Sequence, residues 1–219
     1  IRHAESASNA AGTLSGRMPG VALTDRGRET AAALGDRLAG LDLVLCASSP
    51  MERCRETAAL AGFEKVEVVA GLTECGYGAW TGRALRDLAE DPLWRIVQDS
   101  PGEAHFPASP EYAAESLTQM GERIWATLTG FDADLSSEHG EGVLWAAVTH
   151  GDPIKAALAH ASGAGIGALQ RFRVDPASIS VITWTSGRPT IAAVNTHSGG
   201  LAAFRPRRHT EEVGGGSGD

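Results

Sequence analysis

The sequence predicts an α/β fold in three layers, with a mostly parallel sheet between two layers of helices. Two observations lead to this prediction. Short uninterrupted apolar runs, such as residues 41–47 and 143–148, are typical of parallel strands that are covered on both faces. Segments with apolar residues at helical spacing lie between these runs, so strands and helices alternate along the chain.

The chain has the length and composition of one large domain. It has 219 residues, of which 42% are hydrophobic, and this is ample for one buried core. We expect residues 1–204 to form the domain, with residues 83–116 as a segment that covers the site and sets its specificity. Residues 205–219 are expected to be a disordered tail. There is no room for a strand before Arg2, so we also expect residues to precede Ile1.

The net charge argues against some classes of partner, and the cysteines indicate a cellular compartment. The net charge of -8 argues against nucleic acid or an anionic membrane as the main partner, because both need a basic surface. A small phosphorylated substrate stays compatible, since a local group of arginines can outweigh the overall sign. Three scattered cysteines indicate a reducing compartment, and no apolar run approaches the ~18 residues of a membrane span. We expect a cytoplasmic protein and leave a homodimer open.

The first half of the chain contains two predicted helices around one strand. Residues 24–40 have a good N-cap in Thr24 and a terminating glycine in Gly40, with a buried stripe between them. The apolar run 41–47 follows as a strand. A second helix over residues 51–61 is expected to take Ser49 as its cap.

The second half is predicted to repeat this alternation. We expect a strand over 66–70, then short helices and loops in the proline-broken stretch 83–110. From Glu111 onward, apolar residues at helical spacing predict a core-facing helix. The central strand 143–148 should lead into a helix over 154–161 that is capped by Asp152, and residues 178–184 and 190–195 should pair as a hairpin.

Side chains suited to phosphate chemistry follow the predicted strands. Arg2 and His3 lie where a strand would end and a helix begin, Arg53 lies in the first turn after the strand 41–47, and His150 directly follows the strand 143–148. Glu74 lies in a loop rich in glycine and aromatic residues. Phosphoryl transfer needs an in-line nucleophile, cationic donors and a proton source, and each of these has a candidate here.

Five motifs in register resemble the histidine phosphatase superfamily, in its phosphoglycerate mutase-like branch. The resemblance runs from Ile1 to about Ala161. The motifs are Arg2-His3-Ala4-Glu5-Ser6 with Asn9, Leu23-Thr24 with Gly27, Ser48-Ser49-Pro50 with Arg53 and Thr57, Leu72-x-Glu74 with Gly78-x-Trp80-x-Gly82, and Thr149-His150-Gly151. Ala4 departs from the glycine of the family motif, which adds one methyl group and puts only the detailed geometry in doubt.

The resemblance implies a role for each site residue. His3 would be the nucleophile that forms a phosphohistidine, and Glu74 would protonate the leaving oxygen and later act as a base. Arg2, Arg53 and His150 would hold the phosphoryl group. The remaining phosphate contacts are expected from Asn9, Ser15, Gly16 and Gly151.

The charge states follow from simple electrostatics. A protonated His150 and two guanidiniums should keep His3 neutral by like-charge repulsion, which leaves its lone pair available. Glu74 must be protonated for its first task, and the charge of a bound phosphate should raise its pKa. We expect no metal, because the arginines supply the positive charge.

Three functions stay open. The first is a metal-independent phosphatase for small phosphomonoesters, the second a phosphoglycerate mutase-type phosphomutase that uses 2,3-bisphosphoglycerate, and the third a phospho-ligand-binding protein with weak or no turnover. A mutase needs a basic cover that grips a carboxylate. Between Arg83 and Pro110 the basic residues are few: Arg83, Arg86, Arg95 and His105. This favours the phosphatase, with no cofactor and with its substrate unassigned.

Overall fold

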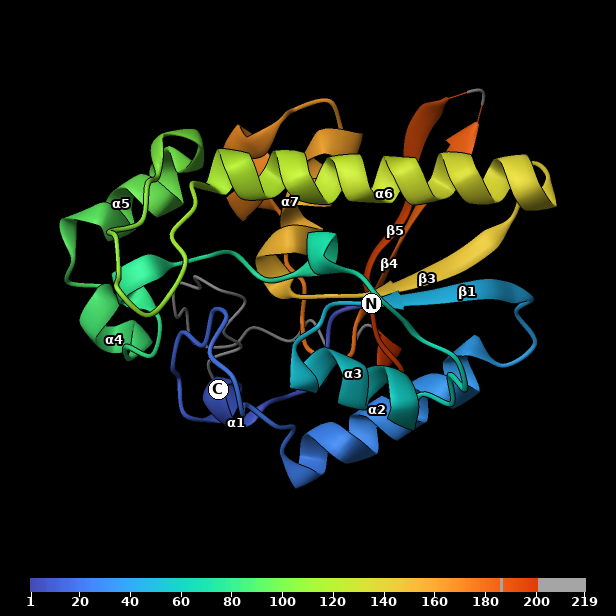
Figure 1. Cartoon of the computed structure of the whole chain (residues 1–219), viewed down its shortest axis with the longest axis horizontal. Coiled ribbons are helices and arrows are strands. Elements are labelled where there is room, and N and C mark those ends of the chain that lie inside the picture. Colours follow the sequence, from blue (N-terminus) through green and yellow to red (C-terminus); the bar gives the residue numbers. More distant parts are fainter. Residues whose placement is uncertain (186, 201–219) are drawn as a thin grey trace.

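The computed structural model describes residues 1–185 and 187–200, so the predicted tail over 205–219 lies outside the described residues. Figure 1 shows helices on both sides of the strands. Helices α6 (Leu117–His139) and α7 (Gly151–Ala161) pack against each other on one side, and α2 (Asp25–Leu38) and α3 (Glu52–Leu60) pack together on the other. The predicted three-layer α/β arrangement is therefore confirmed.

The parallel sheet has β1 (Leu43–Ser48) at its centre, between β2 (Glu67–Val68) and β3 (Leu144–Val148). Ser48 pairs with both Val68 and Val148, so the three strands end at the same edge. The predicted strands 41–47 and 143–148 are confirmed to within two residues. The strand predicted over 66–70 is only two residues long.

The N-terminal segment connects the parallel sheet to a hairpin. His3 N–H donates to the Thr149 carbonyl over 2.9 Å, and Arg2 N–H donates to the Ser178 carbonyl over 3.1 Å. The hairpin consists of β4 (Ile179–Thr185) and β5 (Arg188–Thr196), which pair antiparallel as predicted. Arg2 and Thr149 form a parallel bridge, so residues 2 and 3 lie beside the end of β3.

Local signals explain where two of the long helices begin. Thr24 caps α2 as predicted, with its hydroxyl oxygen 2.9 Å from the Gly27 nitrogen. Helix α6 begins at Leu117, not at Glu111. Ser116 and Gln119 form a reciprocal capping box there, which satisfies two N–H groups at once and fixes the start.

The starts of α3 and α7 differ from the prediction. The N-cap of α3 is Met51, which makes no side-chain cap; Ser49, the predicted cap, instead has its hydroxyl 2.7 Å from His150 Nε2. The N-cap of α7 is His150, so Asp152 lies inside the first turn. Asp152 accepts from the Tyr77 hydroxyl, and Ser49 Oγ contacts the Met51 N–H, 3.4 Å away, as well as His150.

The rest of the described chain includes several short helical pieces. They are α1 (Ala7–Ala10), α4 (Leu85–Leu88) and α5 (Pro92–Asp99), with 3-10 turns at Ala70–Leu72, Gly78–Trp80, Pro101–Glu103 and Ile166–Arg171. Over residues 83–116 the structure thus has short helices and loops, as expected. None of the helices among the described residues is long and apolar enough to cross a membrane.

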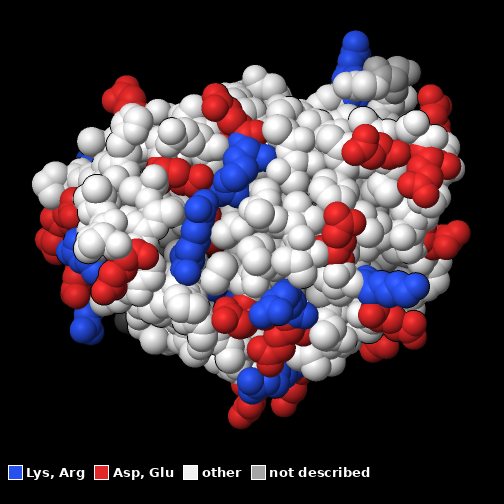
Figure 2. All heavy atoms as spheres, in the orientation of Figure 1, with Lys and Arg blue, Asp and Glu red and all other residues white. Residues whose placement is uncertain are grey.

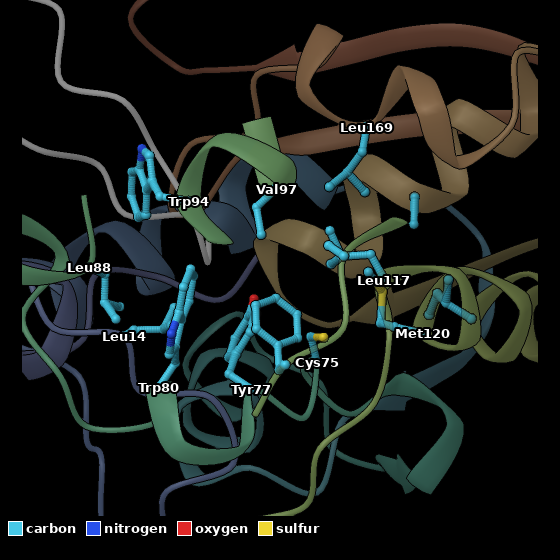
Figure 3. Packing of buried hydrophobic residues seen from close by; sticks show 14 of the residues in the cluster. Leu14, Cys75, Tyr77, Trp80, Leu88, Trp94, Val97, Leu117, Met120 and Leu169 are labelled. Carbon is cyan, nitrogen blue, oxygen red and sulfur yellow. The ribbon is translucent and has the colours of Figure 1, made fainter. Parts of the chain in front are cut away.

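The largest core cluster lies under the stretch 83–116 and supports the loop that carries Glu74. Trp80 and Trp94 are buried (Figure 3), with ring centroids 6.3 Å apart. Tyr77 meets Phe106 edge to face at 4.9 Å. Tyr77 and Trp80, which directly follow residues 74–76, are therefore fixed by aromatic packing, and this restricts the end of the loop.

Candidate active site

Two histidines from opposite ends of the chain meet at the common edge of the sheet. The rings of His3 and His150 have centroids 5.2 Å apart and planes inclined by 66°. Both side chains are buried. The N-terminal segment brings His3 beside the end of β3, and His150 is the residue between β3 and α7.

The hydrogen bond of His3 defines its tautomer. Its Nδ1 lies 2.7 Å from the Ala4 carbonyl oxygen, and because a carbonyl only accepts, the proton lies on Nδ1. The pKa of His3 is well below its ordinary value, first because the ring is buried and then because Arg53 and Arg2 are near. The ring is therefore neutral, and the lone pair on Nε2 is available.

His150 is also neutral, which corrects the expected protonated form. Its pKa is well below the ordinary value, first because of burial and then because of the positive charge of Arg53. Arg53 Nη2 lies 3.1 Å from His150 Nδ1, which must accept, so the proton of the ring lies on Nε2 beside Ser49 Oγ. His3 thus owes its neutrality to burial and to the guanidiniums, not to a charged His150.

The two arginines give this acidic protein a buried positive site. Arg2 and Arg53 are both fully buried. Arg2 Nη1 donates to the Val174 carbonyl over 2.6 Å, and Arg53 Nη2 donates to the Gly16 carbonyl over 2.8 Å. Within residues 1–185 and 187–200, Nε and Nη1 of Arg53 are buried and have no hydrogen-bond partner. Such donors suit a phosphate group.

Glu74 is a buried carboxyl with a raised pKa. Burial, and after it the negative charge of Asp152, raise the pKa of Glu74 to about 7. One oxygen, Oε1, accepts from the Cys75 N–H over 2.9 Å, and the other, Oε2, lies 3.8 Å from His150 Nδ1. Near neutral pH this group can both give and take a proton. The sequence does not predict this effect of Asp152 on the pKa of Glu74; it predicts Asp152 only as a helix cap.

The predicted auxiliary phosphate ligands differ in whether their hydrogen bonds and positions link them to the site. Asn9 Oδ1 accepts from the N–H and the hydroxyl of Ser6, so this oxygen caps α1. The carbonyl of Ser15 accepts from the Met18 N–H over 2.9 Å. These bonds link neither residue to the two histidines. Gly16 reaches the site through its carbonyl, which holds Arg53, and Gly151 is the first residue of α7.

The face of the molecule drawn in Figure 2 does not have one dominant sign of charge. Figure 2 shows acidic and basic side chains interspersed over one face of the molecule. The positive charge of the site comes from the two arginines that are buried inside. Among the described residues, no group of three or more His, Cys, Asp or Glu side chains could hold a metal ion.

Sequence reasoning missed several residues around the site. Ser49 contacts His150, and the side chains of Arg17, Glu115 and Arg123 hold the loop that carries Glu74. Glu115 belongs to a stretch whose path is not predictable from periodicity. No sequence signal marks it, whereas Arg17 directly follows the predicted Ser15 and Gly16.

Comparisons with known proteins identify the family of the chain. The family model of the histidine phosphatase superfamily (branch 1) matches residues 1–197. The adenosylcobalamin/alpha-ribazole phosphatase of Escherichia coli is 30% identical over 206 residues, which cover 92% of this chain and 96% of that protein. Phosphoserine phosphatase 1 of Hydrogenobacter thermophilus is 28% identical over 199 residues, which cover 89% and 90%.

A solved structure extends the comparison to the fold. The crystal structure of the alpha-ribazole phosphatase from Shigella flexneri superposes with a TM-score of 0.72 at 26% identity, and the match covers 90% of this chain and 94% of that chain. The match of the family model spans both histidines and both arginines. This chain belongs to the histidine phosphatase superfamily, branch 1.

Proposed function

We propose that this protein is a phosphatase that hydrolyses small phosphomonoesters through a phosphohistidine on His3. The observation that carries the proposal is the convergence of His3 and His150 beside the buried arginines, with Glu74 3.8 Å from His150. A neutral His3 with its Nε2 lone pair available lies beside buried guanidiniums, and Glu74 titrates at about 7. A nucleophile, an anion site and a proton donor therefore occur together.

The first step transfers the phosphoryl group to the protein. His3 Nε2 attacks the phosphorus, the N–P bond forms, and the bond from phosphorus to the ester oxygen breaks. Glu74 gives its proton to the leaving oxygen and becomes a carboxylate. Arg2 and Arg53 bind the oxygens of the phosphoryl group during the transfer, and His150 donates to one of them through its Nε2–H, which lies beside Ser49 Oγ before substrate binds.

The second step releases the phosphoryl group to water. The Glu74 carboxylate takes a proton from water as the water oxygen bonds to phosphorus, and the N–P bond breaks. Its electron pair returns to His3 Nε2, so orthophosphate is formed and both groups regain their starting state. These steps use only side chains of this chain, and the arginines provide the positive charge.

The auxiliary contacts in this proposal follow the placement of each residue. The N–H of Gly151 lies at the N-terminus of α7, where backbone donors favour a phosphate oxygen. Gly16 acts through Arg53, which its carbonyl orients. Asn9 and Ser15 would contact a phosphate only through polar groups other than the Asn9 Oδ1 and the Ser15 carbonyl, which already accept hydrogen bonds.

Phosphatase activity is favoured over mutase activity by the relatives. Those reported above are named as phosphatases acting on alpha-ribazole or phosphoserine compounds. We infer a small phosphorylated substrate of this kind, with hydrolysis as the outcome. The described part of the chain has three free cysteines, all buried, which fits a reducing compartment such as the cytoplasm.

The proposal is tested by turnover of a panel of phosphomonoesters that includes phosphoserine, alpha-ribazole phosphate and an aryl phosphate. We expect release of orthophosphate, lost by a factor of at least about 10³ in His3→Ala because the nucleophile is gone. His139→Ala is the matched control, since this exposed histidine lies at the far end of α6. Undiminished hydrolysis by His3→Ala would remove His3 from its role, and binding without turnover would favour a phospho-ligand-binding protein.

A further inference from the structure

Three side chains from distant parts of the sequence hold the loop that carries Glu74. They are Arg17, Glu115 and Arg123, and we call them the Glu115 clamp. Glu115 Oε1 lies 2.6 Å from Arg17 Nη2 and 2.6 Å from Arg123 Nη2. The same oxygen accepts from the Gly76 N–H over 3.0 Å. One carboxylate thus joins two guanidiniums and the loop backbone.

The two guanidiniums in turn bind the loop carbonyls around Glu74. Arg17 Nε donates to the Glu74 carbonyl over 2.8 Å. Arg123 Nη1 donates to the carbonyls of Gly71 and Thr73 over 2.8 and 2.9 Å. The backbone is therefore held before, at and after the residue whose side chain reaches His150.

The clamp depends on the negative charge of Glu115. The Glu115 side chain is only 16% exposed, and the side chains of Arg17 and Arg123 are 28% and 24% exposed. Two cations that share one oxygen repel each other when the carboxylate is removed. The loop carbonyls would then lose donors with fixed positions.

We propose that Glu115 is a positioning residue for proton transfer by Glu74. This inference rests on the proposed function, in which Glu74 protonates the leaving oxygen. A general acid works only within hydrogen-bond reach of that oxygen, and a displacement of about 1 Å can cost about 10²-fold in rate. The Glu115 clamp fixes the backbone from which the Glu74 side chain extends, and it does so without touching the phosphoryl group.

The inference is tested by the dependence of kcat/KM on the leaving group. An alkyl phosphate such as phosphoserine needs a proton on its leaving oxygen, whereas 2,4-dinitrophenyl phosphate releases a stable anion and needs none. For Glu115→Gln we expect kcat/KM to fall by about 10- to 100-fold on the alkyl ester and by less than about 3-fold on the dinitrophenyl ester. Glu111→Gln, an exposed glutamate four residues earlier, should change neither.

Further variants separate positioning from general damage. Glu74→Gln combined with Glu115→Gln should lose no more activity on the alkyl ester than Glu74→Gln alone, because both act through one proton. Arg17→Lys keeps the charge but replaces the two separate donors Nε and Nη2 with one ammonium group, so it should show the same selective loss to a smaller degree. It keeps the test decisive if Glu115→Gln does not fold.

Two results would overturn the inference. An equal fall on both esters would show that Glu115 only supports the fold, and unchanged kinetics would show that the Glu115 clamp is dispensable. Either result, together with loss of activity in His3→Ala, would leave the proposed phosphatase function intact. Activity that survives in His3→Ala would instead count against that function.

Discussion

Burial shifts the titratable groups of the site in the directions that the proposed first step needs. Desolvation disfavours the charged form, so it lowers the pKa of His3 and His150 and raises that of Glu74. The same burial therefore keeps a nucleophile deprotonated and an acid protonated. Arg53 reinforces the effect on both histidines but opposes it at Glu74, where burial and Asp152 prevail.

The raised pKa of Glu74 predicts a pH dependence. Below about 7 the carboxyl holds its proton, and above about 7 it loses it, so kcat/KM for an alkyl phosphate should fall as pH rises through this value. His3 stays neutral at mildly acidic pH, because its pKa is lowered, so activity should persist there. The measurement is a pH profile of kcat/KM from about pH 5 to about pH 9.

Glu74→Gln provides the reference for this profile. The second ionisation of a phosphomonoester, near pH ~6, affects both proteins alike, so the ratio of their activities isolates Glu74. The kcat/KM of the parent protein divided by that of Glu74→Gln should decline towards high pH. A ratio that stays constant over the whole range would show that Glu74 is not the titrating acid.

For single residues, the sequence predicted which side chains form the site better than it predicted their protonation states and contacts. Arg2, His3, Arg53 and His150 could be named because their types suit phosphate chemistry and they follow predicted strands. Glu74 could be named because it lies in one of the motifs that resemble the family. The neutral state of His150 could not be predicted, because it depends on complete burial. Nor could the contact of Ser49 with His150, since a hydroxyl after a strand is equally suited to capping the next helix.

The junctions between strands and helices decide how the site is built. The apolar runs and helical spacing predicted β1, β3, α2 and the body of α6. Their ends were less predictable. The predicted starts of α3 and α7 were wrong because Ser49 and Asp152 have tertiary partners, His150 and Tyr77, that compete with capping.

Gly27 shows how closely one junction is packed. A Cβ at this position in the first turn of α2 would lie 2.0 Å from the Glu5 carbonyl oxygen, which belongs to the segment that carries His3. We expect Gly27→Ala to lower the free energy of unfolding by about 1–3 kcal/mol and to reduce turnover, because residues 3–5 must move. Urea unfolding and the aryl phosphatase assay measure the two effects.

Gly130→Ala is the matched control in α6. A Cβ there meets nothing within 4 Å, so the change should stabilise the protein by about 0.5–1 kcal/mol through helix propensity and leave turnover unchanged. If Gly27→Ala proved as stable and active as the parent protein, the close packing of α2 on the N-terminal segment would be refuted.

In the whole molecule, folding brings together groups that are far apart in the chain. The N-terminal segment, the start of α3, the loop after residue 70 and the start of α7 all converge where the parallel strands end together. The alternation of strands and helices predicted this convergence, since ligands of such sheets bind at the carboxyl ends of the strands. The net charge of -8 did not predict the sign of the site, because a sum over the whole chain does not say where Arg2 and Arg53 lie.

The most direct test of the phosphoryl transfer to His3 is to trap the intermediate. The protein is mixed with excess phosphomonoester and quenched in base, where phosphohistidine survives, and its peptides are then analysed by mass spectrometry. We predict that the phosphoryl group is found on His3 and that no label appears in His3→Ala. Rapid turnover without a label, or a label on His150 in place of His3, would contradict the proposed mechanism.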